Sequence, residues 1–367
     1  MRLHDKSSQL RIGFIAGTLG HGGAERQLIF MLRALRNEGI NTRVLCLTKG
    51  EAFEKDIMNL GFKIDWVGKS QNNFVRLGRI IANFREQPVD IIQSVHFYTN
   101  IYAALSGHFL GVGSIGAIRS NLNHEFSANG VFGKWQLKLP GKLIANSQLA
   151  VNNAIARGID SNDVNLVKNA VEDVEQMVPP NRNKGLTVLF AGRLVPIKRP
   201  ELFLDLAMRL TERLPGEKLN FIIAGDGPLR KSLEKKSLEN RSGKAEISFL
   251  GEQKEMSEIY RRSDLLVLTS EFEGTPNVIL EAMAHGLPVV AANVGGVPEI
   301  VPENCGILVN LSQSDGLLEA AVSLIRDSAM RCRMGQNARA FVRKNHSISN
   351  LQGQLTGIYL KMLGQSG

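Results

Sequence analysis

The feature that most constrains the fold of this chain is a regular alternation of short apolar segments with longer amphipathic stretches. In the first half, the apolar segments expected as strands cover residues 12–16, 42–47, 64–66, 90–94, 114–118, 142–145 and 164–167. The alternation starts again in the second half, with strands expected at 187–191, 220–224, 246–250, 264–269, 288–291 and 306–309. Short strands that alternate with helices predict an α/β fold of doubly wound parallel sheets.

The alternation is interrupted at residues 178–185, a polar stretch with two prolines and no apolar period. The chain of 367 residues is long enough for two domains. We therefore expect one domain over 1–178 and a second over 179–345, with a helix in 346–367 that packs back toward the first. Ligands of such sheets bind beyond the carboxyl ends of the strands, so the loops there should carry the chemistry.

Composition and charge exclude several classes of protein. The net charge of +9 is shared almost evenly between the two halves, so the sequence has no basic arm of the kind that binds nucleic acid. An anionic small molecule or membrane surface is the expected partner. Three scattered cysteines argue against a disulfide framework or a zinc site and favour a reducing cytoplasm. The uncharged stretch 91–118 contains glycines and polar residues, so we expect no transmembrane segment, and the polar start predicts no signal peptide.

The first expected strand is followed by a glycine-rich turn, residues 17–23, that opens a helix. Such a turn presents backbone N–H groups to an anion. Glu25 stands where the dinucleotide fingerprint needs its third glycine, and the lysine of a Walker phosphate loop is missing. A nicotinamide dehydrogenase is therefore disfavoured. On its own the turn is explained equally well as a tight strand-to-helix connection.

Three cations gather where the first strand of the second half ends. Arg193, Lys198 and Arg199 precede a helix that Pro200 is expected to start. Because a helix N-terminus already repels positive charge, this cluster is costly unless an anion arrives. We therefore expect a diphosphate ligand, the alternative being that the lysine and the second arginine merely face water.

Two glutamates follow a later strand. Glu273 lies in a loop, and Glu281 lies in an apolar helical stretch beside Leu280 and Met283. A carboxylate in such surroundings needs a partner, because an unsatisfied buried charge is costly. The neighbouring hydroxyls of a sugar offer two donors to one carboxylate, so the pattern suits a polyol ligand.

Together these motifs resemble family 4 of the retaining glycosyltransferases. The resemblance is carried by GGAER at 22–26, VKNAVE at 167–172, GRLVPIKRP at 192–200, EGTPNVILEAMAHGLPVV at 273–290 and GGVPEIV at 295–301. It implies the GT-B architecture, in which two Rossmann-like domains face each other across a cleft. It also implies a metal-independent hexosyltransferase without a cofactor, whose N-terminal domain binds the acceptor and whose C-terminal domain binds a nucleotide-diphosphate sugar.

The resemblance assigns roles to the residues already singled out. Arg193 and Lys198 match the catalytic pair that neutralises the diphosphate leaving group. Glu273 matches a catalytic glutamate that contacts the donor sugar, and Glu281 matches the glutamate that holds the ribose. Six more positions match donor-binding residues of the family: Gly22 and Gly23 in the first loop, Leu250 and Gly251 beside the nucleobase, and Gly274 and Thr275 near the phosphates.

The sequence departs from the family after the strand expected at 114–118. Family members often have a histidine there that contacts the reacting sugar, whereas this chain has Arg119. His96, after the preceding strand, is a candidate substitute for that contact with sugar or acceptor. Asn169-Ala170 in place of Asn-Gly is a milder change. No Asp-x-Asp sequence occurs, which disfavours a diphosphate held by a metal.

A segment of the first half mixes aromatic and basic side chains. Lys134, Trp135, Lys138 and Lys142 all lie within residues 131–142. Such a segment can lie on an anionic bilayer. The simpler interpretation is a helix whose lysines face water and whose tryptophan packs inward. We expect a cytoplasmic protein, peripheral on the inner face of the cell membrane if this segment docks there.

The sequence therefore predicts a glycosyltransferase of polysaccharide biosynthesis. We expect a UDP-sugar as donor, with a GDP-sugar as the alternative, and a lipid-linked or growing surface glycan as acceptor. The competing hypothesis is a two-domain sugar-binding protein without transferase activity. The cluster of Arg193 and Lys198 counts against it, as does the predicted lack of a signal peptide.

Overall fold

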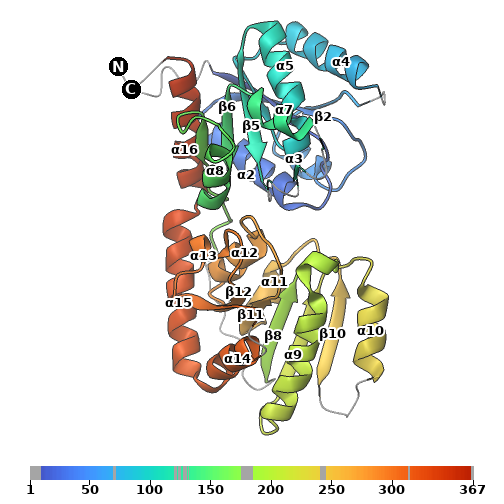
Figure 1. Ribbon diagram of the computed structural model, residues 1–367, viewed down its shortest axis with the longest axis vertical. Coiled ribbons are helices and arrows are strands. Elements are labelled where there is room, and N and C mark those ends of the chain that lie inside the picture. The colour runs from blue at the N-terminus through green and yellow to red at the C-terminus, as the bar shows by residue number, and fades with distance from the viewer. Residues whose placement is uncertain are drawn as a thin grey trace. The chain divides into compact units, whose positions relative to one another are not determined.

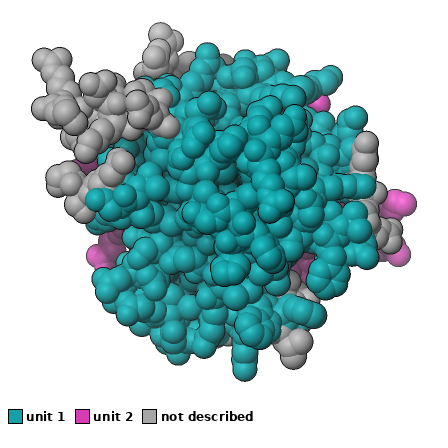
Figure 2. Space-filling view, turned by 90° about the horizontal axis from the view of Figure 1, so that it is seen from above, with its two compact units in different colours: residues 1–170, 348–367 teal, residues 171–347 magenta. Residues whose placement is uncertain are grey.

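The computed structural model describes residues 10–68, 72–119, 122, 125–126, 130, 132–174, 185–239, 245–312 and 315–364. Contacts divide the chain into two compact units, residues 1–170 with 348–367 and residues 171–347, shown in teal and magenta in Figure 2. The chain therefore leaves the first unit after Ala170 and returns to it at Ile348. The expected boundary at 178 and the expected linker, apart from Gly185, lie outside the described residues.

The described part of the first unit is built on a seven-stranded sheet whose neighbouring strands all run parallel. Its spatial order is β3-β2-β1-β4-β5-β6-β7, so the order reverses between β1 and β4. Ligands of open parallel sheets bind at such a reversal, beyond the carboxyl ends of the strands. The strands are β1 (Arg11–Ala16), β2 (Asn41–Cys46), β3 (Ile64–Trp66), β4 (Ile91–Ser94), β5 (Gly113–Ile118), β6 (Lys142–Ala145) and β7 (Val164–Leu166).

Helices cover both faces of this sheet (Figure 1). Side chains of β1 alternate between the faces: Ile12 and Phe14 join a core with α2 and α16, whereas Ile15 joins a core with α4 and α5. Burial on both faces explains why the strand reads as a continuous apolar run. The helices are α2 (Gly23–Asn37), α3 (Glu54–Asn59), α4 (Asn73–Glu86), α5 (Asn100–Leu110), α7 (Phe132–Lys138), α8 (Gln148–Ile155) and α16 (Ile348–Met362), with a 3-10 turn η1 (Phe97–Thr99).

A buried polar contact ties the returning helix α16 to the sheet. The hydroxyl of Tyr359 on α16 donates to Oε1 of Gln93 on β4 at 2.6 Å, and both residues are fully buried. The amide of Gln93 in turn donates to the sulfur of Met31 on α2 at 3.4 Å. Since α16 also packs beside α2, the end of the chain is an integral part of the first unit.

The second unit repeats the plan with a parallel six-stranded sheet over its described residues. The order β10-β9-β8-β11-β12-β13 reverses between β8 and β11. The strands are β8 (Leu186–Ala191), β9 (Leu219–Ala224), β10 (Glu246–Gly251), β11 (Leu265–Leu268), β12 (Val289–Ala292) and β13 (Gly306–Val309). The helices are α9 (Pro200–Arg213), α10 (Arg230–Glu239), α11 (Ser257–Arg261), α12 (Asn277–Ala284), α13 (Val297–Ile300), α14 (Gly316–Arg326) and α15 (Ser328–Asn345), with a 3-10 turn η3 (Pro196–Lys198).

Alternating side chains again divide the core of this unit. Phe190 of β8 packs with α9 and α14 on one face, and Leu189 packs with α12 and α15 on the other. The predicted fold class is confirmed, and each predicted strand has a counterpart whose ends differ by no more than one residue. Among the described residues, no helix is long and apolar enough to cross a bilayer.

Candidate active site

The loops after β8 and β11, which flank the strand reversal of the second unit, are fastened to each other. The hydroxyl of Thr269 lies 2.9 Å from the carbonyl oxygens of both Lys198 and Arg199. The N–H of Glu271 donates to the carbonyl of Ile197 at 2.9 Å. Arg199 has a φ of 47°, the only positive φ outside glycine in the described part of the chain. These bonds therefore hold a strained turn directly beside Lys198.

The fastened loops bring Lys198 and Glu273 into contact. Nζ of Lys198 lies 2.5 Å from Oε1 of Glu273, to which the hydroxyl of Ser270 also donates at 2.6 Å. The side chain of Glu273 is 8% exposed and that of Lys198 is 25% exposed. The pair thus joins a nearly buried carboxylate to a cation that still reaches solvent, at the position where parallel sheets bind ligands.

The backbone of Glu273 is fixed as closely as its side chain. Its carbonyl accepts a hydrogen bond from the N–H of Gly296 at 3.1 Å. A Cβ on the neighbouring Gly295, whose φ is 56°, would lie 1.8 Å from the same carbonyl oxygen. Only glycine fits at position 295, which accounts for the first glycine of the GGVPEIV sequence.

Glu281 is held from a different element. It lies on α12 and is 6% exposed, and its Oε2 accepts a hydrogen bond at 2.9 Å from the hydroxyl of Tyr260 on α11. Nothing in the sequence marks Tyr260 as its partner, because the two residues are 21 positions apart. Ser270, three residues before Glu273, is the kind of short-range partner that the sequence could have suggested.

The other predicted donor residues lie on loops of the same unit. Arg193 follows β8 and is exposed, and no acidic side chain in the described residues pairs with it. Gly274 and Thr275 lie between β11 and α12. Leu250 and Gly251 end β10, where Gly251 accepts a hydrogen bond from the N–H of Gly225 at 2.8 Å.

At the strand reversal of the first unit, His96 joins the loops after β1 and β4. Its Nδ1 accepts the backbone N–H of Gly17 at 3.1 Å, so this nitrogen carries no proton. Its Nε2 therefore carries the proton and donates to Oε1 of Glu25 at 3.0 Å. The hydroxyl of Thr18 donates to the same oxygen at 2.5 Å. Both ring nitrogens of His96 are thus engaged in fixing the glycine turn against the start of α2.

Glu25 is the anionic centre of this cluster. Burial by itself would raise the pKa of Glu25, but the hydrogen bonds from His96 and Thr18 outweigh it and lower the pKa below its usual value. Gly22 lies directly beside this carboxylate, and a Cβ there would be 2.1 Å from its Oε2. A side chain at position 22 would therefore displace the carboxylate of Glu25.

Arg119 follows β5, and its Nη1 donates to Oδ1 of Asn169 at 3.2 Å. It lies at the same carboxyl edge as His96, but no described hydrogen bond joins the two. No group of three or more histidine, cysteine, aspartate or glutamate side chains among the described residues is arranged to hold a metal.

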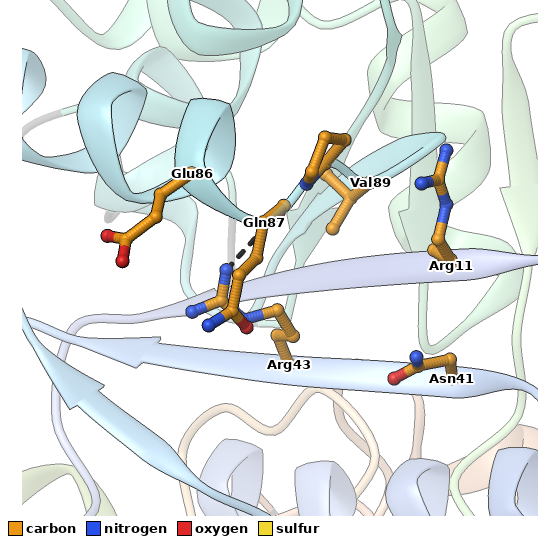
Figure 3. A pocket seen from close by; sticks show the side chains of 7 residues that line it. Arg11, Asn41, Arg43, Glu86, Gln87 and Val89 are labelled. Carbon is orange, nitrogen blue, oxygen red and sulfur yellow. Dashed lines mark hydrogen bonds between the residues drawn. The ribbon is translucent and has the colours of Figure 1, made fainter.

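A pocket of about 290 Å³ lies at the opposite, amino edge of the first sheet (Figure 3). Arg11 and Arg43 line it, and each already has a carboxylate partner, Asp90 at 2.7 Å and Asp65 at 2.5 Å. Its position and the pairing of both arginines separate it from the clusters at the carboxyl edges.

Comparison with known proteins divides the chain in the same place. Residues 21–175 match the family model described as Glycosyltransferase Family 4, and residues 172–341 match Glycosyl transferases group 1.

Similar proteins cover different shares of the chain. An N-acetyl-alpha-D-glucosaminyl L-malate synthase of Bacillus anthracis is 26% identical over 60% of this chain, a match that spans 65% of that relative. A Campylobacter jejuni alpha-1,4-N-acetyl-D-galactosaminyltransferase, named for a diNAcBac-PP-undecaprenol acceptor, is 25% identical over 97% of this chain and 99% of its own length. The crystal structure of Anabaena HepE in complex with UDP-glucose superposes with a TM-score of 0.81 at 20% identity, covering 98% of this chain and all of that one.

The charge of Glu25 should stabilise the protein only where the carboxylate is ionised. A depressed pKa contributes stability that is complete above the usual value of 4.5 and is lost as the pH falls through the lower, folded value. Glu25→Gln should therefore lower the free energy of unfolding by about 1–2 kcal/mol near neutral pH. In urea titrations this gap should shrink toward zero on acidification. Glu258→Gln, which removes a mostly exposed carboxylate, is the matched control and should change little at either pH. If the difference in free energy of unfolding between Glu25→Gln and the wild type persists in acid, the ionised carboxylate is not what stabilises the protein.

Proposed function

The chain belongs to the glycosyltransferases, with family 4 and group 1 domains in a GT-B fold, and on this premise we propose that it is a retaining hexosyltransferase with a UDP-sugar donor. The observation that carries the proposal is the contact between Lys198 and Glu273 at the strand reversal of the second unit. This contact places an ammonium that can bind a phosphate beside a carboxylate that can accept a hydrogen bond from a sugar hydroxyl. The C-terminal unit is accordingly proposed to hold the donor.

Chemistry follows from the charges of this site. As the bond between sugar C1 and the diphosphate breaks, negative charge grows on the leaving oxygen, and Lys198 and the exposed Arg193 stabilise it. The acceptor hydroxyl forms the new bond to C1 on the same face, and its proton passes to the leaving phosphate. Glu273 accepts hydrogen bonds from the donor sugar, and Glu281, steadied by Tyr260, accepts them from the ribose.

Two features support the donor and the acceptor that we propose. The HepE structure, which shares this fold, contains UDP-glucose, and the Campylobacter relative is named for an acceptor on diphosphoundecaprenol. The first unit is proposed to receive the acceptor, a lipid-linked or growing surface glycan, at its carboxyl edge. There the contacts of His96 hold the turn with Gly22 and Gly23 in one conformation.

A membrane-facing role for α7 is supported by what the helix exposes. Phe132 and Trp135 are 62% and 56% exposed, so the tryptophan does not pack inward, and Lys134 and Lys138 are also exposed. Lys142 belongs to β6 instead, and its ammonium pairs with Asp163 at 2.7 Å. We therefore assign docking on an anionic bilayer to Lys134, Lys138 and the two aromatics, and leave Lys142 out.

Lys198→Ala should lower kcat about 10²–10³-fold, because it removes a fixed charge from the developing diphosphate. The rate of UDP release from UDP-glucose measures this loss. Lys236→Ala, which breaks a more exposed ion pair between α10 and Asp205 of α9, should keep the wild-type rate. Equal rates for Lys198→Ala and Lys236→Ala in folded proteins would refute the catalytic assignment.

Calorimetry with UDP, GDP and ADP tests both the nucleotide and the division between the two glutamates. UDP should bind the wild type most tightly. Glu281→Ala should weaken the binding of UDP about tenfold or more, because the ribose loses the carboxylate that accepts its hydrogen bonds. Glu273→Ala should leave UDP binding nearly unchanged and should abolish most sugar transfer. Equal losses of UDP affinity in both variants would contradict the division, and no binding of any nucleotide would contradict the proposed function.

Co-sedimentation with vesicles tests docking by α7. Binding should rise with the fraction of anionic lipid and fall in high salt, because each lysine contributes about 1 kcal/mol near the surface. The double variant Lys134→Gln, Lys138→Gln should bind less than the wild type, and Lys142→Gln is the matched control that should not. Binding indifferent to salt and to both lysines would make α7 a purely structural helix.

A further inference from the structure

Among the residues that the structure describes, the guanidinium of Arg119 has no charged partner. Nη1 donates to the amide oxygen of Asn169 at 3.2 Å, and Nη2 approaches the thioether sulfur of Met31 at 3.7 Å. Nε is fully buried and makes no hydrogen bond. No carboxylate in the described part of the chain forms an ion pair with this side chain. A group with five N–H donors is therefore served by one amide oxygen and one weak acceptor.

The neighbouring polar groups cannot supply the missing charge. Tyr359 faces Arg119 from α16, but its hydroxyl proton is committed to Gln93. Gln93 in turn donates an amide hydrogen to Met31, so this chain of contacts carries no charge. Burial lowers the pKa of Arg119 to about 10, which still leaves it protonated at neutral pH. The protein thus retains an unmatched cation whose burial is costly.

The position of Arg119 separates it from other arginines of the unit. Arg11 and Arg43, at the amino edge, each form an ion pair with a carboxylate of the same chain. Arg119 instead directly follows β5, at the carboxyl edge where parallel sheets bind ligands, and the residue as a whole is partly rather than fully buried. The unmatched charge therefore lies at the edge of the sheet where a substrate is expected to bind.

We propose that Arg119 binds an oxyanion of the acceptor, so that this transferase acts on an acidic acceptor whose carboxylate or phosphate pairs with the guanidinium. The proposal rests on the proposed function, in which the first unit receives the acceptor. A planar guanidinium binds either oxyanion through two parallel hydrogen bonds, which a histidine at this position could not make. The same residue then acts as a selector against neutral acceptors, because a neutral group would leave the cation unmatched.

Thermal unfolding of the full chain with three sugars tests this binding. Glucuronate supplies a carboxylate, glucose 6-phosphate supplies a phosphate, and glucose is the neutral control. One of the two anions should raise the unfolding midpoint of the wild type by about 2–4 °C at saturating concentration, and glucose should not. Whichever anion acts identifies the group. The shift should vanish in Arg119→Gln and persist in Arg43→Gln, the control for the pocket at the amino edge.

A stability measurement separates binding from a structural role. Arg119→Met replaces the unmatched cation with an apolar chain of similar length, so its urea midpoint should equal or exceed that of the wild type. A lower midpoint would make Arg119 a structural residue and overturn the proposal. Anion shifts that are absent from the wild type, equal for glucose, or unchanged in Arg119→Gln would also overturn it.

UDP distinguishes this failure from failure of the proposed function. If UDP raises the midpoint of both the wild type and Arg119→Gln while the anions do nothing, the donor site stands and the acidic acceptor is refuted. If UDP has no effect on the wild type, the proposed function itself fails and the acceptor proposal falls with it.

Discussion

In the first sheet β1 lies between β2 and β4, and in the second sheet β8 lies between β9 and β11. The strand order therefore reverses beside the first strand of each unit. The helices after β1 and β4, like those after β8 and β11, therefore cover opposite faces, and the loops that lead to them diverge above the strand ends. Contacts between the two loops span each divergence. His96 bridges it in the first unit and the pair of Lys198 and Glu273 in the second.

These two bridges differ in the charge that they leave available. In the Glu25 cluster both ring nitrogens of His96 are engaged in hydrogen bonds, so the cluster fixes the glycine-rich turn after β1. Lys198 and Glu273 instead form an ion pair whose lysine still reaches solvent. A phosphate that binds Lys198 does not leave Glu273 without a hydrogen-bond donor, because Ser270 donates to the same carboxylate oxygen. Breaking the pair without such a substitute would strand a buried charge.

The sequence predicts the strands well for a physical reason. A strand buried on both faces is a continuous apolar run, so the expected strands 12–16 and 288–291 stand out from their neighbours. Lys198 and Glu273 could also be foreseen as a group, because parallel strands deliver their loops to one edge. The sequence could not predict which residues far apart in the chain form hydrogen bonds with each other. The pairing of Tyr260 with Glu281 depends on which helices the fold brings together, and that of Gly17 with His96 on which loops.

The same limit applies to orientation. The spacing of residues 131–142 cannot decide whether Trp135 points into the core or into solvent, since a helix of seven residues offers too few apolar positions to define a face. Likewise, Lys142 belongs by sequence with Lys134 and Lys138, but it begins a strand and is neutralised by Asp163. Arg119 could be recognised as a departure from the family, but its lack of a counter-charge is a property of the packed structure alone.

The return of α16 to the first unit has a consequence for how the protein is made. Leu351, Leu355 and Tyr359 belong to the same core as β1 and α2, yet they are synthesised after the whole of the second unit. A chain emerging from the ribosome can complete the contacts of the second unit before it can bury Gln93 under Tyr359. Until then one face of the first sheet stays partly open, so the unit whose synthesis begins first is the last to close its core.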